Sequence, residues 1–113
     1  EKSVIAFLSA RVGSISDNSL GGWYSYRSSK TALNQIVKNF SIELKRTNKN
    51  AIALALQPGT VESKFSEPFK KNVSKDKLFT PDYSVELLSQ VIEGSSANES
   101  GSLLSYDGEI IKP

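Results

Sequence analysis

Two side chains of this sequence, Tyr26 and Lys30, are four residues apart in a stretch with a helical pattern. Residues at this spacing lie one above the other on the same side of a helix. A free phenol titrates near ~10, and a cation within a few ångströms favours the phenolate and lowers that pKa. A phenol tuned in this way can donate a proton to a carbonyl oxygen or take one from an alcohol. The pair therefore predicts acid/base chemistry, while a packed tyrosine beside a solvated lysine is the simpler alternative for the same spacing.

The helix that carries the pair is predicted to run from Trp23 to Arg46. Its apolar residues recur at helical spacing, at Leu33, Ile36, Val37, Phe40 and Leu44. Leu33 and Val37 share a side with Tyr26 and Lys30, so this side should face the rest of the protein. At about 1.5 Å per residue such a helix is long enough to cross a sheet.

Two continuous apolar runs flank this helix, VIAFL at Val4–Leu8 and AIALAL at Ala51–Leu56. Runs of this kind are typical of strands buried on both faces of a parallel sheet. Strand, helix and strand then form one βαβ unit, which should be right-handed. Open α/β sheets bind their ligands at the carboxyl ends of the strands. The residues after the second strand, Gln57 to Ser63, are therefore expected to lie at a binding site.

A Ser/Gly-rich loop precedes the string YRSSKTAL at Tyr26–Leu33, and the strand that follows ends in Pro58-Gly59. This arrangement resembles the C-terminal half of the short-chain dehydrogenase/reductase family, whose members carry a Tyr-x-x-x-Lys pair on such a helix. The strings GSISDN at 13–18 and GGWYSYR at 21–27 look most like the C-factor-like and sniffer-type carbonyl reductases. The resemblance covers nearly the whole chain, from about Ser3 to Lys112. It implies an α/β fold with a Rossmann-type doubly wound parallel sheet, and NAD or NADP as cofactor.

The resemblance also implies roles for single residues. Tyr26 would be the acid/base as a hydride moves between the nicotinamide and the carbon of a carbonyl or alcohol substrate. Lys30 would lower the pKa of the tyrosine and hydrogen-bond the nicotinamide ribose. The family's Pro-Gly-x-Val-x-Ser/Thr stretch, which contacts the nicotinamide end of the cofactor, is matched here by Pro58, Gly59, Val61 and Ser63.

One residue departs from the family pattern. The family's substrate-binding serine would stand at position 10, where this sequence has Ala10. Ser9 is adjacent, but neighbouring residues of a strand point to opposite faces. Ser14 lies in the loop, twelve residues before Tyr26, and we prefer it as the residue that holds the substrate oxygen. Ser9 stays open as the alternative, and water takes the role if neither serine does.

No glycine-rich phosphate loop occurs in the 113 residues, although a dinucleotide fold needs one at its first strand-to-helix turn. We therefore expect residues 1–113 to be the catalytic and substrate-binding half of one Rossmann-type domain. The missing N-terminal half of the same protein would bind the dinucleotide phosphates. The family resemblance further implies a homodimer or homotetramer, with Asn39 and Glu43 at the subunit interface.

The last third of the sequence carries three further signals. Residues 64–79 alternate lysines with apolar residues and correspond to the family's substrate-covering lid. Thr80-Pro81-Asp82 is a strong helix start, and Gly94 should end this helix. Its predicted buried stripe consists of Val85, Leu88, Val91 and Ile92. A short strand is expected at Gly101–Tyr106.

Composition excludes several classes of site. A net charge of +2 argues against a dedicated nucleic-acid or membrane surface, and no apolar run approaches the ~20 residues of a membrane span. The sequence has no cysteine, which removes disulfides and fits a reducing, cytoplasmic compartment. It has no histidine, which excludes a Ser-His-Asp triad and the usual zinc sites within this chain, so no metal site is predicted.

Two other functions fit the same residues. A nucleotide-binding, C-factor-like signalling or regulatory protein on the same fold accommodates the Ala10 departure. A helix-rich interaction module would bind no cofactor at all.

Overall fold

The computed structural model describes residues 1–61 and 78–113. Its helices are α1 (Tyr24–Thr47) and α2 (Pro81–Gly94), and two short 3-10 helices are η1 (Arg11–Gly13) and η4 (Ala97–Glu99). Its strands are β1 (Ser3–Leu8), β2 (Ala51–Gln57), β3 (Thr60–Val61), β4 (Leu78–Phe79), β5 (Leu103–Ser105) and β6 (Ile110–Ile111). No helix of the described ranges is long and apolar enough to cross a membrane.

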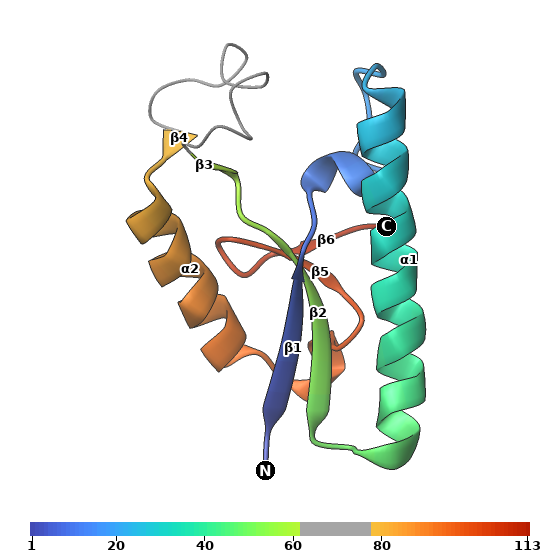
Figure 1. The fold of residues 1–113 in the computed structure, drawn as a ribbon, viewed down its shortest axis with the longest axis vertical. Helices are drawn as coiled ribbons and strands as arrows, with labels where there is room; N and C mark the ends of the chain where they lie inside the picture. Colours follow the sequence, from blue (N-terminus) through green and yellow to red (C-terminus); the bar gives the residue numbers. More distant parts are fainter. Residues whose placement is uncertain (62–77) are drawn as a thin grey trace.

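The main sheet has the strand order β1-β2-β5-β6. The pairs β1–β2 and β2–β5 are parallel, and β6 runs antiparallel to β5. In the first pair Leu8 lies opposite Leu56, so both strands end at the same edge (Figure 1). The predicted parallel α/β sheet is confirmed. The short hairpin strand β6 was not predicted, because two residues are too few to show a strand pattern.

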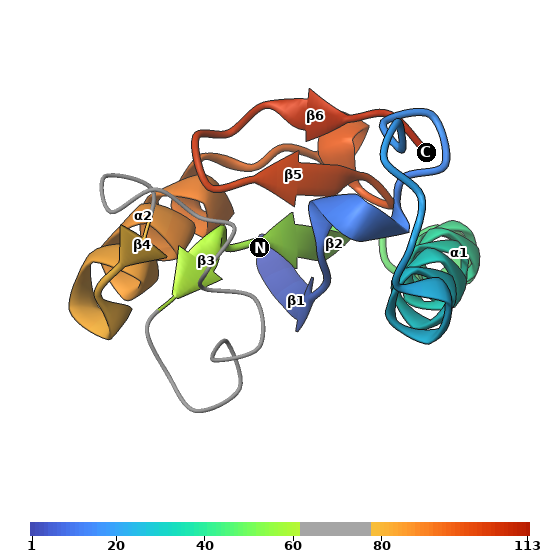
Figure 2. The same ribbon diagram turned by 90° about the horizontal axis from the view of Figure 1, so that it is seen from above.

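Helices α1 and α2 lie on opposite faces of this sheet (Figures 1 and 2). Successive side chains of a strand point to opposite faces, so each face has its own apolar cluster. Beneath α1 the cluster includes Val37 with Ala53 and Ala55 of β2. Beneath α2, Leu54 and Leu56 of β2 pack with residues of the second helix. Helices on both faces of a mostly parallel sheet give the doubly wound arrangement that was predicted.

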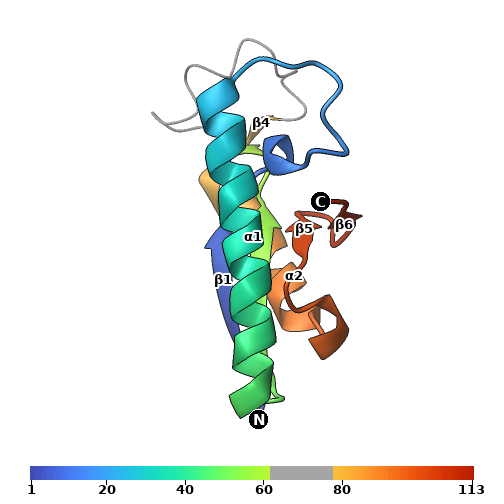
Figure 3. The same ribbon diagram turned by 90° about the vertical axis from the view of Figure 1, so that its right-hand side faces the viewer.

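Helix α1 begins and ends within one residue of the predicted bounds. Its Val37 is fully buried, and Leu33 and Phe40 pack against the same cluster. Figure 3 shows the helix beside β1 and β2, with its first turns extending beyond the strands toward the loop that precedes it. At its end Asn48 is extended, with φ −150°, and its N–H closes the helix on the Leu44 carbonyl oxygen at 2.9 Å.

Helix α2 starts as predicted. The Thr80 hydroxyl accepts the N–H of Tyr83 at 3.2 Å, and Pro81 occupies the first turn. Its predicted buried stripe is correct for Leu88, Val91 and Ile92 and wrong for Val85, which is 63% exposed. Ser84 is buried instead, because it lies four residues before Leu88 on the covered side of the helix.

The two long strands differ in burial. The five inner residues of β2 are buried, as expected for a central strand. Strand β1 was predicted to be buried on both faces, but Ile5 is 43% and Leu8 61% exposed. The reason is position, since β1 is the edge strand of the sheet that the described residues form. Most of the predicted lid, together with Ser63, falls outside the described residues.

Candidate active site

The predicted acid/base pair lies where α1 crosses the end of β1. The Lys30 ammonium donates a hydrogen bond to the Leu8 carbonyl oxygen at 3.2 Å, which places it at the carboxyl end of that strand. The same nitrogen lies 5.8 Å from the centroid of the Tyr26 ring, within the range of a cation–π attraction. Both side chains are half-buried. Tyr26 and Lys30 are therefore together, at the sheet edge that binds ligands in open α/β folds.

The electrostatics of Tyr26 differ from the prediction. Burial raises the pKa of the Tyr26 phenol above its ordinary value of 10.0, because desolvation disfavours the charged phenolate. The Lys30 ammonium, which was expected to lower this pKa, lies near the ring and donates to the Leu8 carbonyl oxygen, but burial has the larger effect. At neutral pH Tyr26 therefore carries its proton and is suited to donating it.

The turn after β2 forms the second side of this edge. Gly59 has φ +77°, a left-handed conformation that favours glycine. A Cβ at this position would lie 2.8 Å from a ring atom of Phe79, so the ring packs directly on the glycine backbone. Phe79 also makes edge-on contacts with Tyr83 and Tyr106, at centroid distances of 5.2 and 4.8 Å. The turn is therefore rigidly supported, and strand β3 starts directly after it.

Both candidate serines are buried and hydrogen-bonded within the protein. The Ser9 hydroxyl donates to the Asn34 side-chain oxygen at 2.5 Å. The Ser14 hydroxyl donates to the Lys112 carbonyl oxygen and accepts the Asp17 N–H at 3.1 Å. A hydroxyl has one proton to donate, so neither serine has a spare donor in this structure. That Ser14 holds the substrate oxygen stays a prediction.

Two residues that the sequence did not single out hold the loop before α1. The Arg27 guanidinium donates to the carbonyl oxygens of Gly22 at 3.0 Å, Gly21 at 3.2 Å and Val12 at 3.4 Å. The Thr31 hydroxyl lies 2.7 Å from the Gly13 carbonyl oxygen. Both residues lie inside the YRSSKTAL string, but only the folded loop brings carbonyl groups to them. The spacing of four residues between Arg27 and Thr31, which puts both on one side of the helix, was the one available signal.

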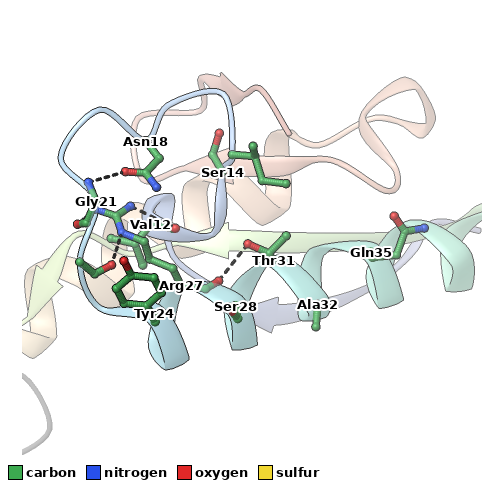
Figure 4. A pocket seen from close by; sticks show the side chains of 12 residues that line it. Val12, Ser14, Asn18, Gly21, Tyr24, Arg27, Ser28, Thr31, Ala32 and Gln35 are labelled. Carbon is green, nitrogen blue, oxygen red and sulfur yellow. Dashed lines mark hydrogen bonds between the residues drawn. The ribbon is translucent and has the colours of Figure 1, made fainter.

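A surface cavity of about 550 Å³ lies between this loop and the first turns of α1 (Figure 4). Figure 4 shows Ser14 on its loop wall and Thr31 and Gln35 on its helix wall. The lining residues are Val12, Ser14, Ile15, Asn18, Gly21, Gly22, Tyr24, Arg27, Ser28, Thr31, Ala32 and Gln35. Neither Tyr26 nor Lys30 belongs to this lining. The acid/base pair and Ser14 are thus assigned to different surfaces of the described residues.

Comparison with known proteins gives a consistent result. No protein-family model matches the chain. The chain is 34% identical over 104 residues to the C-signal protein of Myxococcus xanthus, which covers 92% of this chain and 57% of that protein. It is 30% identical over 112 residues to the 1-hydroxy-2-glutathionyl-2-methyl-3-butene dehydrogenase of Rhodococcus sp. strain AD45. This match covers 99% of this chain and 47% of that protein. The chain spans about half the length of these curated relatives.

Solved structures agree with these relatives. The carbonyl reductase Sniffer of D. melanogaster superposes with a TM-score of 0.83 at 27% identity, covering 98% of this chain and 41% of that one. A putative short-chain dehydrogenase/reductase from Burkholderia multivorans with bound NADP superposes with a TM-score of 0.73 at 26% identity. This match covers 97% of this chain and 44% of that one. Both matches extend over nearly all of this chain. The homologues and structural neighbours that match nearly all of this chain are thus members of the short-chain dehydrogenase/reductase family.

Proposed function

We propose that this chain is the catalytic half of an NADP(H)-dependent oxidoreductase that reduces a carbonyl compound to an alcohol. The observation that carries the proposal is the position of Lys30 and Tyr26 together at the carboxyl end of β1. The relatives include a dehydrogenase and a carbonyl reductase, and the B. multivorans neighbour contains bound NADP. For this reason we propose NADP(H) rather than NAD(H).

Two features of the described residues support a nicotinamide cofactor at this edge. The left-handed Gly59 turn follows β2, and the Lys30 ammonium lies at the end of its neighbour β1. In this proposal Pro58, Gly59 and Val61 contact the nicotinamide end, as does Ser63 from outside the described residues. Lys30 donates hydrogen bonds to the ribose. When bound, the reduced cofactor supplies a hydride to the carbonyl carbon.

Tyr26 is the acid in this proposal. Its phenol donates a proton to the carbonyl oxygen, which becomes the hydroxyl of the product alcohol. The raised pKa of Tyr26 keeps the phenol protonated at neutral pH, which is the form that donates a proton. Ser14, or alternatively Ser9 or water, is proposed to hold the substrate oxygen. Either serine would have to turn its hydroxyl proton from its present internal acceptor to the substrate.

We also propose that the nucleotide phosphates bind a preceding segment of the same protein. The 113 residues contain no glycine-rich phosphate loop, and the apolar side chains of Ile5 and Leu8 on the edge strand are exposed. Pairing of further strands with β1 would cover them. A homodimer or homotetramer through the outer face of α1, near Asn39 and Glu43, and a cytoplasmic location complete the proposal.

The test is a comparison of two tyrosine variants in the complete protein, with NADPH and a panel of aldehydes and ketones. Tyr26→Phe removes the donated proton and is expected to lower kcat by about 10²–10⁴-fold, while the Kd for NADPH changes little. Tyr83→Phe makes the same chemical change on α2 and should retain full turnover. Normal turnover by Tyr26→Phe would refute the acid role of this residue.

A second function is favoured by one observation. The C-signal protein is similar over 92% of this chain, and Ala10 replaces the family serine while Ser9 and Ser14 donate their protons internally. A nucleotide-binding regulatory protein needs no substrate-binding serine. Equal biological activity from the wild type and from Tyr26→Phe, together with NADPH binding and no turnover, would support this function over catalysis.

A further inference from the structure

The end of β1 is attached to α1 by two side chains of the helix. Lys30 bonds the carbonyl oxygen of Leu8, the last residue of the strand, at 3.2 Å. One turn further along the helix, Asn34 accepts the hydroxyl proton of Ser9 at 2.5 Å. The two helix residues are four apart and therefore stand one above the other on the same side. Two adjacent residues of the strand end thus meet two successive turns of the helix.

The Ser9–Asn34 contact is a part-buried polar pair on the helix that also carries Leu33 and Val37 of the apolar cluster. Ser9 is 5% exposed, and its backbone N–H also donates to the Leu56 carbonyl oxygen at 2.7 Å. Ser9 is therefore fixed to β2 through its backbone and to α1 through its side chain. Buried polar contacts of this kind add little net stability but specify one orientation, since the alternative leaves a desolvated group unpaired.

We propose that the Ser9–Asn34 hydrogen bond positions Lys30 for its role beside Tyr26. The backbone bond from Ser9 to Leu56 fixes the Leu8–Ser9 peptide to β2, and Lys30 binds the carbonyl oxygen of that peptide. The Ser9–Asn34 bond ties the next turn of α1 to the same strand end, and so fixes how the helix turn that carries Lys30 sits against this peptide. Asn34 is thus a positioning residue that acts on Lys30 through the helix. The expected effect on catalysis rests on the proposed function, whereas the position of Lys30 does not.

The test measures the hydrogen bond of the Lys30 ammonium directly and needs neither cofactor nor turnover. Ammonium protons that are hydrogen-bonded exchange slowly with water, so NMR of ¹⁵N-labelled protein reports the Lys30 contact, assigned by the signal that disappears in Lys30→Arg. Asn34→Leu and Ser9→Ala are each expected to speed this exchange several-fold. Asn34→Asp keeps an oxygen acceptor for the Ser9 hydroxyl and should restore the wild-type signal.

A matched control is available on the same helix. Asn39 accepts a hydrogen bond from the Gln35 amide at 3.2 Å on the exposed side, so Asn39→Leu makes the same substitution and also removes an amide contact. It should leave the Lys30 signal unchanged. The double variant Ser9→Ala/Asn34→Leu should behave like either single variant, because both remove one bond. Circular dichroism confirms that each variant keeps its helix content.

The outcomes separate this inference from the proposed function. An unchanged Lys30 signal in Asn34→Leu, or effects of the two single variants that simply add, would overturn the positioning role. Where Lys30 responds as expected, kcat of the complete protein should also fall, on the order of ten-fold, for Asn34→Leu. A Lys30 signal that responds while Tyr26→Phe retains turnover would leave positioning supported and refute the catalytic proposal instead.

Discussion

Gly13 lies against the helix at the point where Lys30 is attached. A Cβ built on Gly13 would lie 2.8 Å from the carbonyl carbon and from the Cβ of Lys30, and 2.9 Å from the Thr31 nitrogen. Two of these three atoms belong to the backbone, so they cannot turn aside as a flexible side chain does. Gly13→Ala is therefore expected to push the loop away from α1. The backbone of Gly13 is not left-handed, so the contact alone sets the effect.

Two opposing effects set the change in the free energy of unfolding of Gly13→Ala. Overpacking of a well-packed contact typically costs about 1–3 kcal/mol. Replacing glycine by alanine also restricts the unfolded chain, which stabilises the folded state by about 0.4–1 kcal/mol. Gly94, the last residue of α2, is the matched control, because no atom lies within 4 Å of a Cβ built there. The unfolded-state term is common to both variants, so their difference isolates the contact at Gly13, about 1–3 kcal/mol.

Urea unfolding followed by circular dichroism measures this difference. With a slope of about 2 kcal/mol per M urea, the midpoint of Gly13→Ala should lie roughly 0.5–1.5 M below that of Gly94→Ala. The Gly94 variant itself should unfold at or slightly above the wild-type midpoint. Equal midpoints for the two variants would show that the loop does not approach α1 closely, and the reasoning about this part of the site would be refuted.

Three further predictions concern single contacts. Thr80→Ala removes the side-chain acceptor for the Tyr83 N–H and should destabilise the protein by about 1 kcal/mol in urea unfolding, whereas Thr80→Ser should not. In the nucleotide-free protein the Tyr26 phenol should ionise above pH 10.0, measured as the tyrosinate absorbance that Tyr26→Phe lacks; ionisation below this value would mean that Lys30 outweighs burial. Because the pKa of Tyr26 is raised in the folded state, ionisation of this phenol should lower the free energy of unfolding. The contribution is fully present below pH ~10 and is lost as the pH rises through the folded pKa. Gly59→Ala should weaken NADPH binding and stability together, and adding Phe79→Leu should restore only part of the loss, because the left-handed backbone at φ +77° stays strained.

The sequence by itself determined the local parts of this protein. The apolar period of α1, the continuous apolar run of β2 and the Thr80-Pro81 start of α2 depend on neighbours along the chain, and the structure has all three as predicted. The proximity of Tyr26 and Lys30 follows from the same helical period, since a spacing of four residues fixes their common side. For these features no knowledge of the rest of the fold was needed.

Only the tertiary structure decided how these parts meet. The partners of Lys30, Ser9 and Gly13 are separated from them by 22, 25 and about 17 residues, and they depend on how deeply α1 sits against the end of β1. The sign of the Tyr26 pKa shift is of the same kind, because desolvation depends on what covers the ring. Exposure of β1 likewise follows from its place at the sheet edge and cannot be read from its apolar residues. Long-range contacts are set by packing, which a local pattern does not encode.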